Sequence, residues 1–173
     1  MYFEFIDNIE ANDTIKTLKL KKRTSFDSVN EDRIPWEHNG LVDEVSYGLV
    51  GTHQFITNKV GTDKLLAILP KWATRLEIPR VSIVRLYVGD EPENMLPWHV
   101  DYGRKSVLNW YTHTNGETTK YRHGDFVAEN GDIYLMAADK EHCVLMTSGV
   151  REMVSFSYLH TDLERLLEAR HAN

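Results

Sequence analysis

Apolar and polar side chains alternate along most of the chain from residue 80 onward. The segment VSIVRLYV (81–88) shows this pattern first, and short segments of the same kind recur after it. Because successive residues of a β strand point to opposite faces of a sheet, a period of two predicts strands. The expected strands are 81–88, 106–112, 118–121, 132–137, 142–147 and 151–159. Turn signals such as Asn115-Gly116 and Asn130-Gly131 separate them, which favours an antiparallel sandwich or barrel.

The first 80 residues carry a less regular pattern. YFEFI (2–6) is compatible with a short strand, and residues 11–23 alternate like a strand before they end in a small basic run. Residues 24–61 are rich in Asn, Asp, Gly and Ser, which predicts loops and short strands. We therefore expect a helical and loop-rich half that supports the strands.

A helix is predicted over residues 63–76, where apolar residues recur at helical spacing. These residues are Leu65, Leu69, Trp72 and Leu76. Thr62 or Asp63 is expected to cap the start of the helix. Pro70 lies inside it and is expected to kink or shorten it.

A second helix is predicted at the end of the chain. It starts at about Leu163, and Thr161 and Glu164 have the spacing of a capping box. Together the elements predict a mainly β protein with flanking helices. We expect a single domain over 1–173, with a supporting segment at 1–80, a β core at 81–160 and a helix at 161–173.

Composition narrows the class of protein. The chain has 173 residues, of which 42% are hydrophobic and 27% are charged, as in a soluble globular domain. The net charge of −6 argues against nucleic acid or an anionic membrane as a partner. No apolar run reaches the roughly 20 residues that a membrane helix needs. The start, MYFEFIDNIE, lacks the core of a signal peptide, so we expect a cytoplasmic protein.

The only cysteine is Cys143, so an internal disulfide and a cysteine-rich zinc site are both excluded. Eight histidines remain as candidate ligands. His99 and Asp101 form a His-x-Asp pair, and on extended backbone both side chains point to the same face. His142, at the start of a later strand, is the best third ligand. Two histidines and one carboxylate form the facial triad of non-haem Fe(II) oxygenases.

The chain contains a second His-x-Asp pair, His123-Gly124-Asp125. Polar residues and a glycine surround it, so we interpret it as a surface turn. Five histidines remain. His38, His53 and His171 have no ligand-like neighbours, His113 lies at a hairpin tip, and His160 ends the last strand.

Arg151 starts the last predicted strand, nine residues after His142. If this strand and that of His142 line one cavity, Arg151 lies in mostly apolar surroundings. A buried guanidinium needs an anionic partner, and a bound carboxylate would suit its fork of donors. The pattern also allows an arginine that pairs with a distant acidic residue or points outward.

Two segments resemble the 2-oxoglutarate- and Fe(II)-dependent oxygenases. RLYVGDEPENMLPWHVDYG resembles the stretch that carries a tyrosine, a glycine turn and the His-x-Asp pair. GDIYLMAADKEHCVLMTSGVREMVSFSYL resembles the C-terminal signature with the second histidine and an arginine. The resemblance covers about residues 81–159. Tyr87 suggests a prolyl-hydroxylase-like member, whereas HVDYGRKSVLNW, with Arg104, suggests an aspartyl/asparaginyl β-hydroxylase.

The resemblance assigns roles to individual positions. His99, Asp101 and His142 match the iron ligands, and Arg151 matches the residue that binds the distal carboxylate of 2-oxoglutarate. The further positions that match cosubstrate contacts are Tyr87, Asn109, Tyr111 and Ser155. The implied fold is a double-stranded β-helix, or jelly roll, over residues 81–160.

The implied activity is hydroxylation of a small molecule or a peptide or protein side chain, with Fe(II), 2-oxoglutarate and O2 as cofactor and cosubstrates. The second arginine of the family's nucleic-acid demethylases is absent, because residues 152–160 contain no Arg. Two alternatives stay open: a non-catalytic jelly-roll module that binds a metal or carboxylate, and a cupin-type metalloenzyme without 2-oxoglutarate. The sequence predicts neither the substrate nor the oligomeric state.

Overall fold

A computed structural model gives the architecture of the chain. It describes residues 1–11, 13–22, 51–88, 95–101, 103–145 and 149–172. Among the helices of these residues, none is long and apolar enough to cross a membrane.

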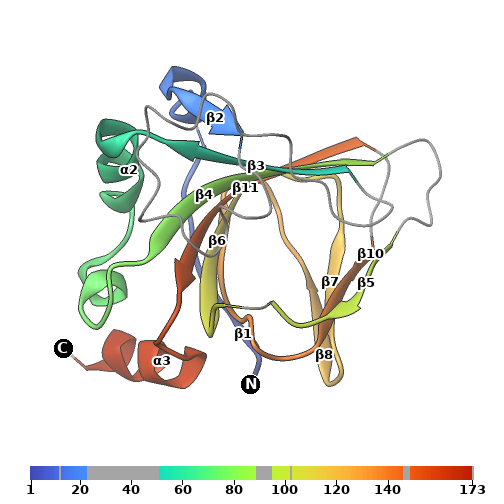
Figure 1. The fold of residues 1–173 in the computed structure, drawn as a ribbon. Helices are drawn as coiled ribbons and strands as arrows, with labels where there is room; N and C mark the ends of the chain where they lie inside the picture. The colour runs from blue at the N-terminus through green and yellow to red at the C-terminus, as the bar shows by residue number, and fades with distance from the viewer. Residues whose placement is uncertain (12, 23–50, 89–94, 102, 146–148, 173) are drawn as a thin grey trace.

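Two antiparallel sheets dominate the structure (Figure 1). A seven-stranded sheet has the order β1-β9-β6-β11-β4-β3-β2, and a four-stranded sheet has the order β5-β10-β7-β8. The strands are β1 (Phe3–Asn8), β2 (Leu20–Lys22), β3 (Gly51–Thr57), β4 (Arg80–Val88), β5 (Met95–His99), β6 (Ser106–His113), β7 (Thr118–Tyr121), β8 (Gly124–Val127), β9 (Asp132–Ala137), β10 (His142–Leu145) and β11 (Gly149–Tyr158).

The chain passes back and forth between the sheets from β4 to β11. β4, β6, β9 and β11 form the centre of the large sheet, whereas β5, β7, β8 and β10 form the whole small sheet. This is the topology of a double-stranded β-helix, so the predicted mainly β, jelly-roll fold is confirmed. The segment expected to be helical and loop-rich also adds β1, β2 and β3 to the large sheet.

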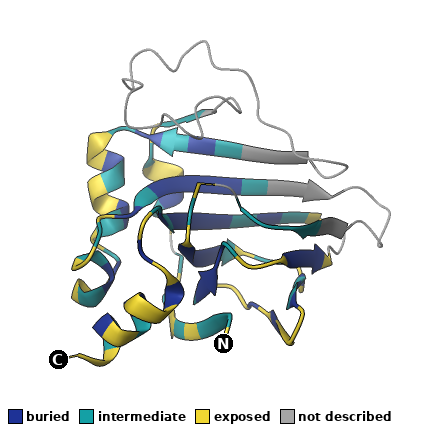
Figure 2. Ribbon diagram, turned by 60° about the horizontal axis from the view of Figure 1, so that its bottom comes forward, coloured by how far each residue is buried: buried dark blue, intermediate teal, exposed yellow. Residues whose placement is uncertain are grey.

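Alternation along β11 separates two apolar clusters. Val154, Phe156 and Tyr158 face the cluster that the helices cover. Met153 belongs to a second cluster, with Tyr111, that lies between the two sheets. Figure 2 shows this buried strand interior beside helices that are exposed on one side. The predicted period of two therefore distinguishes the helix-covered face from the barrel interior.

The predicted single helix over 63–76 is wrong. The structure has a helix α2 (Lys59–Leu66) and a separate 3-10 turn η4 (Lys71–Thr74). Asn58 caps α2, since its side chain accepts a hydrogen bond from the Gly61 amide. Pro70 lies between the two elements and has extended backbone, so it breaks the helix rather than kinking it. Leu76, the last of the four apolar residues at helical spacing, is 43% exposed.

The C-terminal helix is α3 (Leu163–His171), as predicted, but its cap differs. Asp162 is the N-cap, and its side chain accepts from the Arg165 amide. Thr161 does not cap the helix, because its hydroxyl donates to Glu77 Oε1. A tertiary contact thus removes the residue that the local motif favours.

The second His-x-Asp pair is not a simple surface turn. Only His123 lies in the turn, and residues Gly124–Val127 form β8 at the edge of the small sheet. The structure describes β10 as far as Leu145, and residues 146 and 147 of the expected strand lie outside the described residues. His38 also lies outside the described residues.

Candidate active site

Two opposed strands of the small sheet bring the predicted metal ligands together. His99 ends β5 and lies directly opposite His142, the first residue of β10. Asp101 follows two residues after β5, where its amide donates to the Ala138 carbonyl at 2.9 Å. His99 thus lies in a strand and Asp101 in the following loop, and a backbone hydrogen bond to Ala138, just after β9, holds the loop.

The three side chains converge at one point. His99 Nε2 lies 3.4 Å from Asp101 Oδ1, and His142 Nε2 lies 3.7 Å from Asp101 Oδ2. One ligand atom from each residue lies within 4.8 Å of the others. Two atoms bound to one ion at about 2.1 Å and at right angles are about 3 Å apart. The ligand atoms therefore have to move closer together than their separations of 3.4 Å to at most 4.8 Å to hold a divalent ion.

The surroundings of His142 suit a metal ligand. Its Nδ1 lies 2.8 Å from the Lys140 carbonyl oxygen. Because a carbonyl only accepts, Nδ1 carries the hydrogen and Nε2 keeps its lone pair toward Asp101. Burial lowers the pKa of His142 below its ordinary value, although the Asp101 charge opposes this. Neutral imidazole, the form that binds metals, is thereby favoured.

Arg104 holds the Asp101 carboxylate. Its Nε and Nη2 donate to Asp101 Oδ2 at 3.1 and 2.7 Å, and its Nη1 donates to Ser157 Oγ at 2.9 Å. Burial alone would raise the pKa of Asp101. The Arg104 charge and the hydrogen bond with His99 outweigh burial and keep the pKa well below its usual range. Asp101 is therefore ionised, as a metal ligand must be.

Arg151 lies in the barrel interior, and some of its N–H donors have no acceptor among the described residues. The residue is 4% exposed, and within the described part of the chain its Nε and Nη1 have no hydrogen-bond partner. The ring centroid of Tyr111 lies 5.7 Å from the Arg151 Cζ. No acidic side chain of the described residues pairs with it. An unpaired buried guanidinium is costly, so this position suits a bound anion.

Three more candidate cosubstrate residues lie on the same side of the large sheet. Ser155 Oγ donates to Asn109 Oδ1 at 2.7 Å, and the two residues are register partners of β11 and β6. Asn109 Nδ2 and the Tyr111 hydroxyl both donate to Met136 Sδ, at 3.4 and 3.6 Å. Burial raises the pKa of Tyr111, although the Arg151 charge opposes this, so the phenol stays a neutral donor. Thioether sulfur is a weak acceptor, so both donors could turn to a better one.

The register does not support the role predicted for Tyr87. In the β11–β4 pair, Arg151 is opposite Leu86, whereas Tyr87 is opposite Val150. Residues directly opposite each other share a face of a sheet, so position 87 belongs to the face opposite that of Arg151. The side chain of Tyr87 lies outside the described residues.

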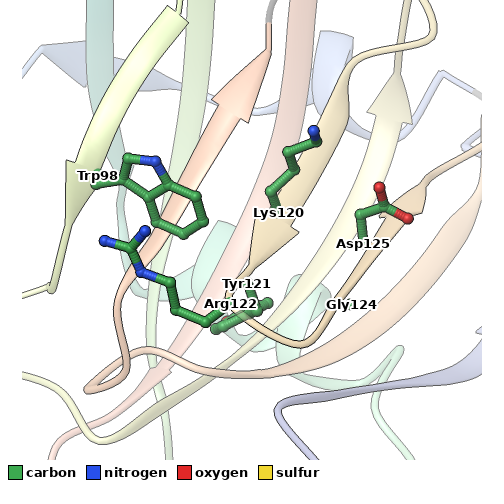
Figure 3. A pocket seen from close by; sticks show the side chains of 6 residues that line it. All are labelled: Trp98, Lys120, Tyr121, Arg122, Gly124 and Asp125. Carbon is green, nitrogen blue, oxygen red and sulfur yellow. The ribbon is translucent and has the colours of Figure 1, made fainter.

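The outer face of the small sheet carries a separate, polar surface cavity of about 360 Å³. Figure 3 shows Trp98, Lys120, Arg122 and Asp125 around it. The Arg122 guanidinium lies 4.0 Å from the Trp98 ring and pairs with Glu141 at 3.1 Å. Trp98 and Glu141 directly precede His99 and His142, so Arg122 bridges the two ligand-bearing strand ends from outside.

Two neighbours of the site escaped the sequence analysis. Tyr121 lies opposite His142 in the β10–β7 register, with ring centroids 5.4 Å apart, and its hydroxyl donates to the Ala137 carbonyl. Arg104 was noted only as part of a resemblance. Its spacing of three from Asp101 could have suggested a contact, but Ser157 is 53 residues away and gave no signal.

Comparisons with known proteins gave similarities in structure only. No family model and no curated protein matches the chain. A 2OG-Fe(II) oxygenase family oxidoreductase from Burkholderia pseudomallei is 14% identical, with 69% of this chain and 74% of that chain covered and a TM-score of 0.48. A prolyl-4-hydroxylase from Pseudomonas putida is 13% identical, with 86% and 96% covered and a TM-score of 0.47. A cupin-2 domain protein from Shewanella frigidimarina is 12% identical, with 54% and 87% covered and a TM-score of 0.33.

Proposed function

We propose that this protein is a non-haem Fe(II)- and 2-oxoglutarate-dependent dioxygenase that hydroxylates a small molecule or a peptide or protein side chain. The observation that carries the proposal is the coexistence of two sites in one jelly roll. One is the cluster of His99, Asp101 and His142, and the other is the buried Arg151, whose Nε and Nη1 have no hydrogen-bond partner among the described residues. The cluster alone would suit many metals, but a cupin-type enzyme without 2-oxoglutarate leaves Arg151 without a role.

Bound iron would supply oxygen activation, in which one oxygen atom enters the substrate C–H bond and the other enters succinate as 2-oxoglutarate loses CO2. His99, Asp101 and His142 would hold the ion and leave its remaining positions open. Arg151 would pair with the distal carboxylate of the cosubstrate, and Tyr111, Asn109 and Ser155 would lie beside it.

The apolar side chains around these groups have a role of their own. Val144 and Met153 belong to the interior cluster and are 3% and 7% exposed. Side chains of this kind exclude water from a site, which strengthens charge pairing with Arg151 and limits side reactions of an oxidant.

Binding is tested first, because it needs no substrate. The metal-free protein is titrated with 2-oxoglutarate in the presence of Mn(II), with thermal unfolding as the readout. We expect a rise in Tm that needs both components and that disappears in Arg151→Gln. Stabilisation by Mn(II) but not by 2-oxoglutarate would favour the cupin-type alternative and overturn the cosubstrate assignment.

Turnover is tested next by succinate release with Fe(II), O2 and a panel of amino acids, peptides and small acids, with His142→Ala as the blank. We expect one substrate class to raise succinate release above the substrate-free rate. If both ligands bind but no succinate is released, with or without a member of the panel, the result would favour a non-catalytic binding module.

A further inference from the structure

Next to the proposed metal site, Arg104 contacts the two oxygens of the Asp101 carboxylate unequally. Two of its N–H groups meet a single oxygen, Oδ2, at 2.7 and 3.1 Å. The other oxygen, Oδ1, is left beside His99 Nε2 at 3.4 Å. His142 Nε2 lies 3.7 Å from Oδ2. The carboxylate therefore has one oxygen that accepts from the Arg104 cation and one that faces His99.

The guanidinium itself is fixed from a second direction. Its Nη1 donates to Ser157 Oγ at 2.9 Å, and Ser157 lies on β11, the strand that also carries Arg151. The backbone around Arg104 is tied to the same strand, because the Lys105 amide donates to the Tyr158 carbonyl at 2.8 Å. Gly103, with φ of 83°, allows the sharp turn that returns Arg104 to Asp101.

From this geometry we infer that Arg104 is a positioning residue that holds Asp101 as a one-oxygen metal ligand and ties the metal site to β11. Arg104 does not contact the ion or the substrate. It occupies Oδ2, which disfavours two-oxygen coordination, and it leaves Oδ1, beside His99, as the oxygen that meets an ion. The inference rests on the proposed function, since it assumes that the cluster binds a metal.

A purely electrostatic role and a positioning role of Arg104 predict opposite changes in metal affinity when the residue is removed. One substitution therefore distinguishes the two roles. The guanidinium is a positive charge beside a cation site, so a purely electrostatic role means that its removal tightens metal binding. A positioning role means that its removal weakens binding, because the carboxylate then loses its fixed orientation. Residues that orient metal ligands typically contribute 10- to 100-fold in affinity.

The test is a titration of the metal-free protein with Mn(II), in which the free ion is followed by its electron paramagnetic resonance signal. Arg104→Met is expected to raise the Kd for Mn(II) about 10- to 100-fold. Arg104→Lys keeps the charge and one donor, so its Kd is expected between those of Arg104→Met and the wild type. Arg165→Met, an exposed arginine on α3, is the matched control and is expected to leave the Kd unchanged.

An Arg104→Met variant that binds Mn(II) as tightly as the wild type, or more tightly, overturns the inference while the proposed function stands. If that variant does not fold, Ser157→Ala removes only the bond that fixes the guanidinium, and a several-fold weaker affinity is expected; an unchanged affinity overturns the inference. A wild-type protein that binds no Mn(II) overturns the inference and the proposed metal site together.

Discussion

His99 and His142 lie directly opposite each other in the β5–β10 ladder, with ring centroids 4.4 Å apart. Residues opposite each other in an antiparallel pair project to the same face, so the pairing register alone brings both imidazoles together. A shift of one residue in either strand would turn one imidazole to the other face. Metal binding at this cluster therefore depends on the correct pairing register of the small sheet.

The two His-x-Asp pairs provide a matched test of the metal site. His99→Ala is expected to abolish Mn(II) binding, because it removes one of three ligands. His123→Ala, in the pair whose histidine is exposed in the turn before β8, is expected to bind Mn(II) like the wild type. Equilibrium dialysis with metal analysis measures both variants. Equal loss in the two variants, or no loss in His99→Ala, contradicts the assignment.

Removal of the buried Arg151 guanidinium is expected to stabilise the protein and to abolish cosubstrate binding. Arg151→Met replaces a guanidinium that has no partner among the described residues with an apolar side chain of similar length. Such replacements of buried charge are often neutral or stabilising by 1–4 kcal/mol, so the free energy of unfolding is expected to rise by about 1–2 kcal/mol. The increase in Tm on addition of 2-oxoglutarate is expected to disappear. Urea unfolding and thermal unfolding measure the two effects.

Arg85→Met is the control for that prediction. Arg85 is 28% exposed and pairs with Glu152 at 2.7 Å. Its loss breaks a partly exposed ion pair, so we expect a destabilisation of about 1 kcal/mol and no change in the response to 2-oxoglutarate. Destabilisation of Arg151→Met by as much as Arg85→Met would mean that Arg151 is paired within the protein.

The sequence predicts the barrel strands well and their ends less well. Alternation identifies β6, β7, β9 and β11 because each has one face in the interior and one against the helices or solvent. β5 escapes detection because MLPWH contains a proline and has no alternation. β8 escapes because Gly124 and Asp125 resemble a turn, although they pair with β7 at a sheet edge.

The sequence also predicts only part of the candidate site. A short motif and a strand start are enough to nominate His99, Asp101 and His142, and strand alternation places Arg151 on an interior face. Contacts between distant segments leave no local pattern. The bond of Arg104 to Ser157 is one example, and the bond of Thr161 to Glu77 in place of a helix cap is another.

Acid is expected to destabilise the metal-free protein through His142. Burial lowers the pKa of His142 below its ordinary value of 6.5, which the unfolded chain recovers. Below pH 6.5 the unfolded state binds a proton that the folded state does not, so the free energy of unfolding falls as the pH falls. The slope for one such group is at most about 1.4 kcal/mol per pH unit. Urea unfolding at pH 7.5, 6.5 and 5.5 with a chelator measures it.

His142→Asn removes the titrating group and is expected to lessen that slope. Asp101 does not interfere in this range, because its lowered pKa means that its contribution is lost only at more acid pH. An identical slope in His142→Asn and the wild type would show that His142 does not cause the acid destabilisation.

Two buried tyrosines are expected to differ in what their hydroxyls do. The Tyr121 hydroxyl donates to the Ala137 carbonyl at 2.8 Å, whereas the Tyr111 hydroxyl donates to the weak acceptor Met136 Sδ at 3.6 Å. Burial raises the pKa of both phenols, so both remain neutral donors. Tyr121→Phe breaks a good hydrogen bond, and we expect a loss of about 1 kcal/mol of unfolding free energy.

Tyr111→Phe loses little stability, but it removes a donor beside Arg151. The Kd for 2-oxoglutarate is therefore expected to rise about 10-fold, as for loss of one hydrogen bond to a charged group. Unfolding and 2-oxoglutarate titration of both variants distinguish the roles, and a reversed pattern would move the cosubstrate carboxylate away from Tyr111.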